Sequence, residues 1–223
     1  MKIDCLDKGY VELLSHTPDG DLLVVNAARC SFDKQHEEFD FEKDAKLINY
    51  LARERHVLPF RHPNVTLRIH APLFVLRQLG KHQVGFSWSE VSRRYIDSKP
   101  EFYSPVTFRA RPDKGIKQGS KHTEPFGKND FCRERYDNAE QVAYNEYKRL
   151  LTAGVAPEMA RAVLPQSMYT TTVTTGTLLG WHHMYQLRTE EHTQYETQRY
   201  AKAVDLILKE LYPISWTALK HNV

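Results

Sequence analysis

One stretch of the chain is dense in side chains that bind anions. Residues 77–95 read RQLGKHQVGFSWSEVSRRY, and within them Glu90, Ser92 and Arg94 are spaced by two. An extended backbone would point all three to the same side. A hydroxyl beside a guanidinium suits a phosphate group, because arginine offers a planar fork of donors and stays charged. The alternative is a solvated strand face that carries a Glu–Arg pair.

Two further positions in the chain fit the same kind of site. Gln78, Lys81 and His82 are spaced i, i+3, i+4, so we expect them on one face at the end of a helix. Arg161 lies in the segment PEMARAVLP, an otherwise apolar short helix between two prolines. An arginine in this setting is either a surface residue or an anion ligand, and the segment alone does not distinguish them.

A polar segment near the C-terminus, residues 181–199, reads WHHMYQLRTEEHTQYETQR. Arg188 and His192 are one helical turn apart. The histidines and glutamates here could suggest a metal site, but no His-Glu-x-x-His is present and the carboxylates adjoin His192 instead of lying one turn away. We therefore expect the wall of a polar pocket and no metal.

The elements that position these residues are predicted from periodicity and turn signals. Two or three strands are expected over residues 2–26, one over 65–71 and one over 168–176, with an extended segment over 86–96. Helices are expected over 40–54, capped by Asp40 and burying Phe41, and from Pro72 to about Lys81. Later helices are expected at about 133–153, 157–164, 177–189 and 193–211. Residues 109–131 are rich in Gly, Pro and Lys and predict a loop or partly disordered insert.

Bulk composition sets limits on the class of protein. The chain has 223 residues, 41% of them hydrophobic and 26% charged, which is ordinary for one folded domain. It has no long apolar run and no signal-peptide pattern, and its three cysteines, Cys5, Cys30 and Cys132, do not form a pairing motif. These features predict a cytoplasmic protein. A net charge of +3 is too small to indicate nucleic acid and fits an enzyme for anionic small molecules.

Taken together, these segments resemble the flavin-dependent thymidylate synthases from end to end. The matching blocks are MKIDCLDKGYVEL with VVNAARCSFDK, APLFVLRQL, SEVSRRY with EFYSP, ARAVLP, and QLRTEEHTQYE. The family core is Arg-His-Arg, seven residues and then Ser. Here that region reads Lys81-His82-Gln83 and has one extra residue before Ser92. Lysine keeps the first charge without the planar fork, and glutamine loses the second charge.

The resemblance implies an α+β fold over residues 1–223, a single domain with a mixed or antiparallel sheet flanked by helices. It implies the reductive methylation of dUMP to dTMP, with methylenetetrahydrofolate as one-carbon donor and FAD reduced by NADPH. It also implies a homotetramer whose sites are shared between subunits, with no nucleic-acid or membrane partner.

The resemblance also assigns residues. The positions that match dUMP contacts are Gln78, Lys81, Glu90, Ser92, Arg94, Arg161 and Arg188. The positions that match FAD contacts are Ser31, His62, Lys81, His82, Gln83 and His183. Arg188 would be the catalytic residue. Its charge would favour the ionised or enolate-like pyrimidine and raise electron density at C5, the task that a thiolate performs in cysteine-dependent thymidylate synthases.

Two alternatives remain at this stage. A nucleotide-binding relative could have lost its activity through Lys81 and Gln83. A nucleic-acid-binding module could use the basic stretch from Arg109 to Lys128, although Asp113, Glu124 and Asp130 dilute its charge and no binding motif is present. An activity assay and the salt dependence of DNA binding distinguish these alternatives from the synthase.

Overall fold

The computed structural model describes residues 1–96, 98–112, 114–115, 119–120 and 127–223. Within these residues, five strands form one sheet in the order β1-β2-β3-β5-β4, and every pairing is antiparallel. The strands are β1 (Lys2–Cys5), β2 (Gly9–His16), β3 (Asn64–Pro72), β4 (Phe86–Glu90) and β5 (Tyr169–Thr177). Thus β3 and β5, far apart in the sequence, form the centre of the sheet.

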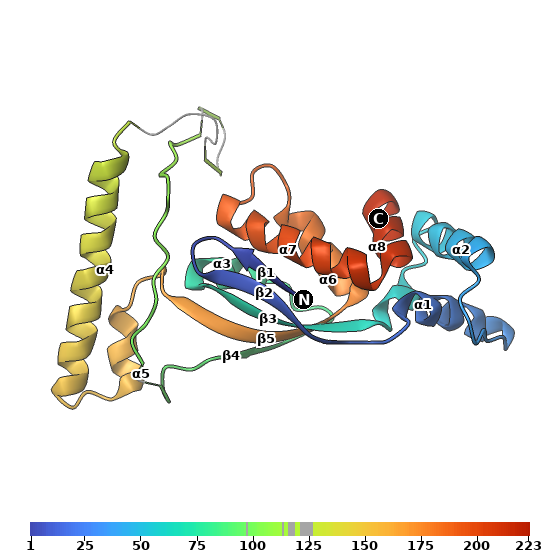
Figure 1. Cartoon of the computed structure of the whole chain (residues 1–223), viewed down its shortest axis with the longest axis horizontal. Coiled ribbons are helices and arrows are strands. Elements are labelled where there is room, and N and C mark those ends of the chain that lie inside the picture. Colours follow the sequence, from blue (N-terminus) through green and yellow to red (C-terminus); the bar gives the residue numbers. More distant parts are fainter. Residues whose placement is uncertain (97, 113, 116–118, 121–126) are drawn as a thin grey trace.

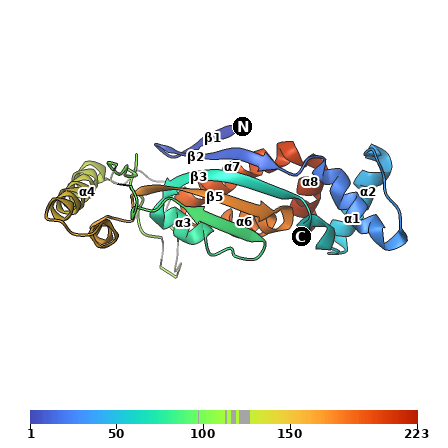
Figure 2. The ribbon, with the colours of Figure 1, turned by 90° about the horizontal axis from the view of Figure 1, so that it is seen from below.

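One face of this sheet builds the core because β3 alternates buried and half-buried residues. Val65, Leu67 and Ile69 are fully buried and point toward the helices. Helices α6 (Leu178–Arg188), α7 (Tyr195–Leu211) and α8 (Pro213–Asn222) cover that face (Figure 1). Figure 2 views the opposite face, on which the strands lie in front of these helices. The expected α+β fold with an antiparallel sheet is confirmed.

The remaining helices lie at the two ends of the sheet (Figure 1). At one end are α1 (Gly20–Arg29) and α2 (Phe41–Arg53), joined by the short 3-10 turn η1 (Cys30–Phe32) and followed by a second, η2 (Leu58–Arg61). At the other end are α4 (Asn129–Thr152), α5 (Pro157–Ala160) and the 3-10 turn η3 (Arg161–Val163). The short helix α3 (Leu73–Leu79) follows β3 directly. None of the helices in the described ranges is long and apolar enough to span a lipid bilayer.

The structure differs from the prediction at both ends of the chain. Residues 20–26 form the start of α1 and not a strand, because Val24 and Val25 are buried from a helix and a short apolar run fits either element. Helix α8 was not predicted. It begins at Pro213, and Asp21 of α1 accepts hydrogen bonds from the backbone N–H groups of Ile214 and Ser215 at 3.1 and 2.9 Å.

The predicted helix over 40–54 is confirmed as α2, with the Asp40 side chain accepting from the Lys43 N–H. Its buried face differs from the prediction in one position, since Phe41 is exposed and the carboxylate of Asp44 is buried instead. Arg29 and His36 contact that carboxylate at 2.7 and 3.3 Å, which explains how a charge is accommodated there.

The region between β3 and α4 is less regular than predicted. Helix α3 ends at Leu79, so Lys81 and His82 follow it in a turn, and the extended segment ends at Glu90. Pro72 is the last residue of β3 and not the first of a helix. The described part of the insert contains little regular structure until α4 begins at Asn129, four residues before the predicted start; positions 113, 116–118 and 121–126 lie outside the described residues.

Candidate active site

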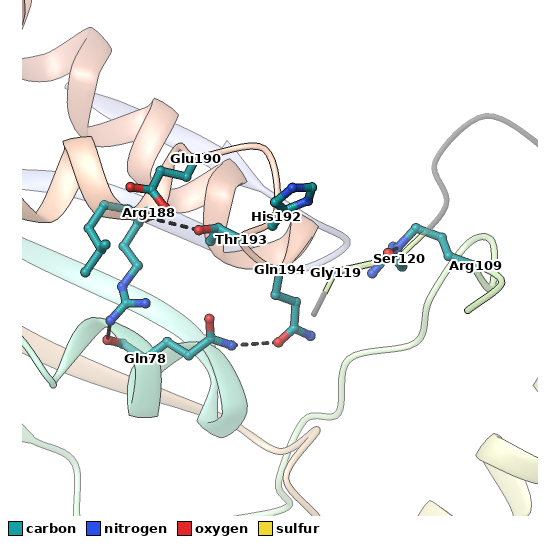
Figure 3. A pocket seen from close by; sticks show the side chains of 10 residues that line it. Gln78, Arg109, Gly119, Ser120, Arg188, Glu190, His192, Thr193 and Gln194 are labelled. Carbon is teal, nitrogen blue, oxygen red and sulfur yellow. Dashed lines mark hydrogen bonds between the residues drawn. The ribbon is translucent and has the colours of Figure 1, made fainter. Parts of the chain in front are cut away.

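Arg188 is the last residue of α6 and lines a cavity of about 570 Å³. Its Nε donates to His82 Nε2 at 3.1 Å. Its Nη2 donates to the Gln78 carbonyl at 2.9 Å (Figure 3). Both partners are neutral, so neither cancels the charge of the guanidinium. We call this space the Arg188 cavity; its lining residues are Gln78, Arg109, Gly119, Ser120, Leu187, Arg188, Glu190, His192, Thr193 and Gln194.

His82 is held in its neutral form. Burial, together with the nearby charges of Arg188 and His183, lowers the pKa of His82 to about 4. A neutral imidazole that accepts at Nε2 carries its proton on Nδ1. Partial burial also lowers the pKa of Arg188, while Glu190 opposes that shift. The pair therefore consists of one fixed cation and one neutral acceptor.

Gln78 connects α3 to the loop that follows Arg188. Its side-chain Nε2 donates to Gln194 Oε1 at 2.6 Å, while its carbonyl accepts from Arg188 (Figure 3). Three predicted residues, Gln78, His82 and Arg188, are thus in direct contact although 110 positions separate Gln78 from Arg188. The predicted helix face for Gln78, Lys81 and His82 was wrong, because the turn after Leu79 carries the last two.

A second cavity, of about 730 Å³, contains Glu90, Arg161 and Gln83. Burial raises the pKa of Glu90, and the Thr170 hydroxyl and the positive charges of Arg161 and Arg77 act in the opposite direction. We call this the Arg161 cavity. Its lining residues are Leu73, Leu76, Arg77, Gly80, Gln83, Trp88, Glu90, Val91, Arg93, Glu158, Arg161, Ala162, Leu164, Gln166, Met168, Thr170 and Thr172.

Two arginines of the Arg161 cavity were missed in the sequence. Arg77 precedes Gln78 on α3, and Arg93 lies in the turn after β4, where it is 8% exposed and donates to the Ser98 carbonyl at 2.8 Å. Arg93 lies between Ser92 and Arg94, so the alternation predicted for Glu90, Ser92 and Arg94 did not include it. The cavity brings three guanidinium groups and two carboxylates together, a set of charges that fits an anion with several oxygens.

Ser92 and Arg94 meet in a way that differs from the prediction. The strand ends at Glu90, so the three residues do not share a strand face. Instead the turn folds Arg94 back, and its Nε and backbone N–H both donate to Ser92 Oγ, at 3.2 and 3.4 Å. Among the described residues, neither Ser92 nor Arg94 lines the two cavities.

The predicted flavin positions come from several elements, and one of them, Gln83, lines the Arg161 cavity. His183 is exposed. Partial burial and the charge of Arg61 lower the pKa of His183, and the charge of His183 is one of the causes that lower the pKa of His82, so His183 lies near both residues. His62 follows Arg61 and is exposed, as is Lys81. Ser31 lies in η1. Among the described residues, no hydrogen bond connects η1 to the other predicted flavin positions. Exposed imidazoles beside Arg61 fit a flavin nucleotide, because they offer aromatic faces and donors to its phosphates.

Residues 12–214 match the family model described as "Thymidylate synthase complementing protein". The chain is 36% identical over 223 residues to the flavin-dependent thymidylate synthase of Thermus thermophilus, covering 100% of this chain and 80% of that protein. To the enzyme of the same name from Kosmotoga olearia it is 38% identical over 218 residues, covering 98% and 93%. The chain belongs to the flavin-dependent thymidylate synthase family.

A solved relative gives the same fold for this flavin-dependent thymidylate synthase homologue. The crystal structure of the UMP/dUMP methylase PolB from Streptomyces cacaoi, bound with 5-Br dUMP, matches with a TM-score of 0.85 at 32% identity, covering 98% of this chain and 97% of that one. A second PolB structure, bound with 5-Br UMP, matches with a TM-score of 0.80 at 30% identity. The family and the enzyme class predicted from the sequence are therefore confirmed.

Proposed function

We propose that this enzyme converts dUMP to dTMP, taking the one-carbon unit from methylenetetrahydrofolate and reducing equivalents from NADPH through FAD. The observation that supports it best is the charge of Arg188, fixed by two neutral hydrogen-bond partners at the wall of a cavity large enough for a small ligand. Bound FAD would supply the redox chemistry. His62, His82 and His183 would hold it, with Lys81, Gln83 and Ser31 as further contacts.

Arg188 would perform the activation. A guanidinium held against neutral partners can meet the polar edge of a uracil ring and stabilise the negative charge that develops there. That charge makes C5 a better nucleophile without addition of a thiol to the ring. The free cysteines agree with this route: Cys5 is buried, where burial raises its thiol pKa to about 12, and Cys30 and Cys132 line neither cavity in the described residues.

The phosphate end of the nucleotide would be bound by the second group of residues. Arg161 and the Ser92–Arg94 turn would contact phosphate oxygens, Glu90 would meet a ribose hydroxyl or orient Arg161, and Gln78 and Lys81 would complete the contacts. Because these residues fall in two cavities and one exposed turn of a single chain, we propose that the sites are completed between subunits of a homotetramer. Light scattering of the purified protein measures that state.

A second candidate substrate is UMP. It is favoured by the similarity to PolB, a methylase for UMP and dUMP whose structures hold the 5-bromo forms of both. The experiment that tests the proposal compares product formation from dUMP and from UMP with FAD, NADPH and methylenetetrahydrofolate present. Formation of dTMP supports the proposal; a higher kcat/KM for UMP would replace dUMP by the ribonucleotide, and no product from either would indicate a relative that has lost activity.

A further inference from the structure

A buried carboxylate lies beside the Arg188 cavity, outside the residues assigned above. Glu196, in the first turn of α7, is 2% exposed. Both of its oxygens accept from Arg109 Nη2, at 2.7 and 2.9 Å, and Oε1 also accepts from the Tyr103 hydroxyl at 3.1 Å. A buried carboxylate with these charge-assisted partners fixes the guanidinium that it binds.

Arg109, the first residue of the insert, also contacts a later described residue of it. Its Nε donates to Ser120 Oγ at 2.8 Å, and its guanidinium lies 5.0 Å from the centre of the Tyr195 ring. Gly119 packs on the loop after Arg188: it has a φ of +93°, and a Cβ there would lie 3.4 Å from the His192 carbonyl oxygen. The Arg109 side chain therefore connects α7 to the part of the insert that packs on the 189–194 loop.

Arg109, Gly119 and Ser120, which we call the Arg109 wall, line the Arg188 cavity. Figure 3 shows Arg109 and Ser120 across this space from Arg188 and Gln78. Arg109 also lines a neighbouring cavity of about 550 Å³ that contains Tyr103. The guanidinium thus lies between two cavities, and its position sets where the first one ends.

We propose that Arg109 is a positioning residue for the Arg188 cavity, held by Glu196. The ion pair fixes the Arg109 wall against the 189–194 loop, so that the cavity has its shape before a ligand enters. This inference rests on the proposed function in one respect, that the cavity takes the nucleotide. A preformed wall raises affinity because less ordering is needed on binding.

The simplest alternative is that the Arg109–Glu196 pair only stabilises the fold. Breaking a buried pair leaves an unpaired charge and lowers stability in either case, so melting temperature alone does not separate the two. The positioning role adds a local effect on the 189–194 loop and on nucleotide affinity in protein that remains folded and loaded with FAD.

The test compares Arg109→Ala, Arg109→Lys and the double variant R109A/E196Q with Arg111→Ala as matched control. Arg111 is an exposed arginine of the same insert. Hydrogen exchange of residues 189–194 is measured without ligand, and dUMP affinity is measured on FAD-loaded protein. We expect R109A to speed exchange about tenfold and weaken dUMP binding by about tenfold, the scale of one lost charged hydrogen bond. Lysine should restore part of both effects, and the double variant should resemble R109A because the two groups act together.

Exchange in 189–194 that is unchanged in folded R109A, or equal in R111A, would overturn the positioning role. So would a lower melting temperature with unaltered dUMP affinity. If wild-type protein neither binds nor converts dUMP while R109A still speeds exchange, the structural role of Arg109 is supported and the proposed function is refuted. If the R109A protein does not fold, R109K carries the same comparison, because it keeps a cation opposite Glu196.

Discussion

The two cavities use arginine in opposite ways. Arg188 is half-buried and bonded to a neutral imidazole and a carbonyl, so its charge is directed at whatever enters the cavity. Arg161 is exposed and shares its cavity with Arg77, Arg93 and the carboxylate of Glu90. The first arrangement suits stabilisation of charge that develops during a reaction, and the second suits an anion already charged before it binds. The difference separates chemistry from affinity within one protein.

The largest effect is expected when Arg188 itself is removed. Arg188→Ala should lower kcat for dTMP formation by about 10²–10³-fold, the scale of one lost electrostatic donor in an active site. FAD content should stay unchanged, because the imidazoles assigned to it remain. Steady-state kinetics and the ratio of flavin to protein absorbance measure both. A variant with normal kcat would show that the cation does not act in the chemical step.

Substitutions in or beside the Arg161 cavity should instead lower the affinity for dUMP. Arg161→Ala, or Arg94→Ala in the adjoining turn, should weaken dUMP binding by about 1.5–3 kcal/mol with a smaller effect on kcat at saturation. Isothermal titration gives the dissociation constants. Arg149→Ala is the matched control, since Arg149 is an exposed arginine of α4 that pairs with Glu146. A loss confined to kcat would reverse the roles given to the two cavities.

The free energy of unfolding of the protein should depend on pH through His182, a buried residue of α6, the helix that carries Arg188. Burial lowers the pKa of this 2%-exposed histidine to about 4, from an ordinary value of 6.5. The unfolded chain therefore takes up its proton first, and the free energy of unfolding should fall between pH 6.5 and pH 4 by roughly 2–3 kcal/mol from this group. Urea unfolding of wild type and of His182→Gln across that range tests it; equal slopes for the two proteins would contradict it.

A smaller effect is expected from His82, the neutral imidazole that accepts from Arg188. Because the pKa of His82 is about 4, its ring accepts from Arg188 throughout the neutral range and loses that bond only as pH falls toward 4. His82→Gln, which keeps an acceptor without a titrating ring, should retain activity within about tenfold and lose the acid limb of the kcat profile that this group causes. An acid limb identical to wild type would assign that limb to another group.

The sequence predicted the sheet and most helices because their patterns are local. The alternation of β3 and the cap at Asp40 are examples. It placed α1 in a strand, since Val24 and Val25 fit both periods, and it extended α3 through a turn that begins at Gly80. A residue pattern gives the period of an element more reliably than its end.

The sequence predicted which residues form the site but not which of them contact one another. The family motifs assigned Arg188, Gln78 and His82, but nothing in their spacing shows that they touch. Glu196 did carry a local signal: it lies one turn before Tyr200 on the buried face of α7, where a carboxylate needs a cation. The identity of that cation, Arg109, depends on how the insert folds back, which no periodicity in residues 109–131 predicts.

The most direct measurement is the visible absorbance of purified wild-type and Arg188→Ala protein, each loaded with FAD and titrated with dUMP. We expect flavin bands in both proteins. Adding dUMP should change those bands in wild type, and in the variant the change should be much smaller but should saturate at a similar dUMP concentration, because the Arg161 cavity still binds the nucleotide while the cation that polarises its ring is gone. Protein that takes up no FAD, or a response to dUMP that survives removal of Arg188 intact, would contradict this expectation.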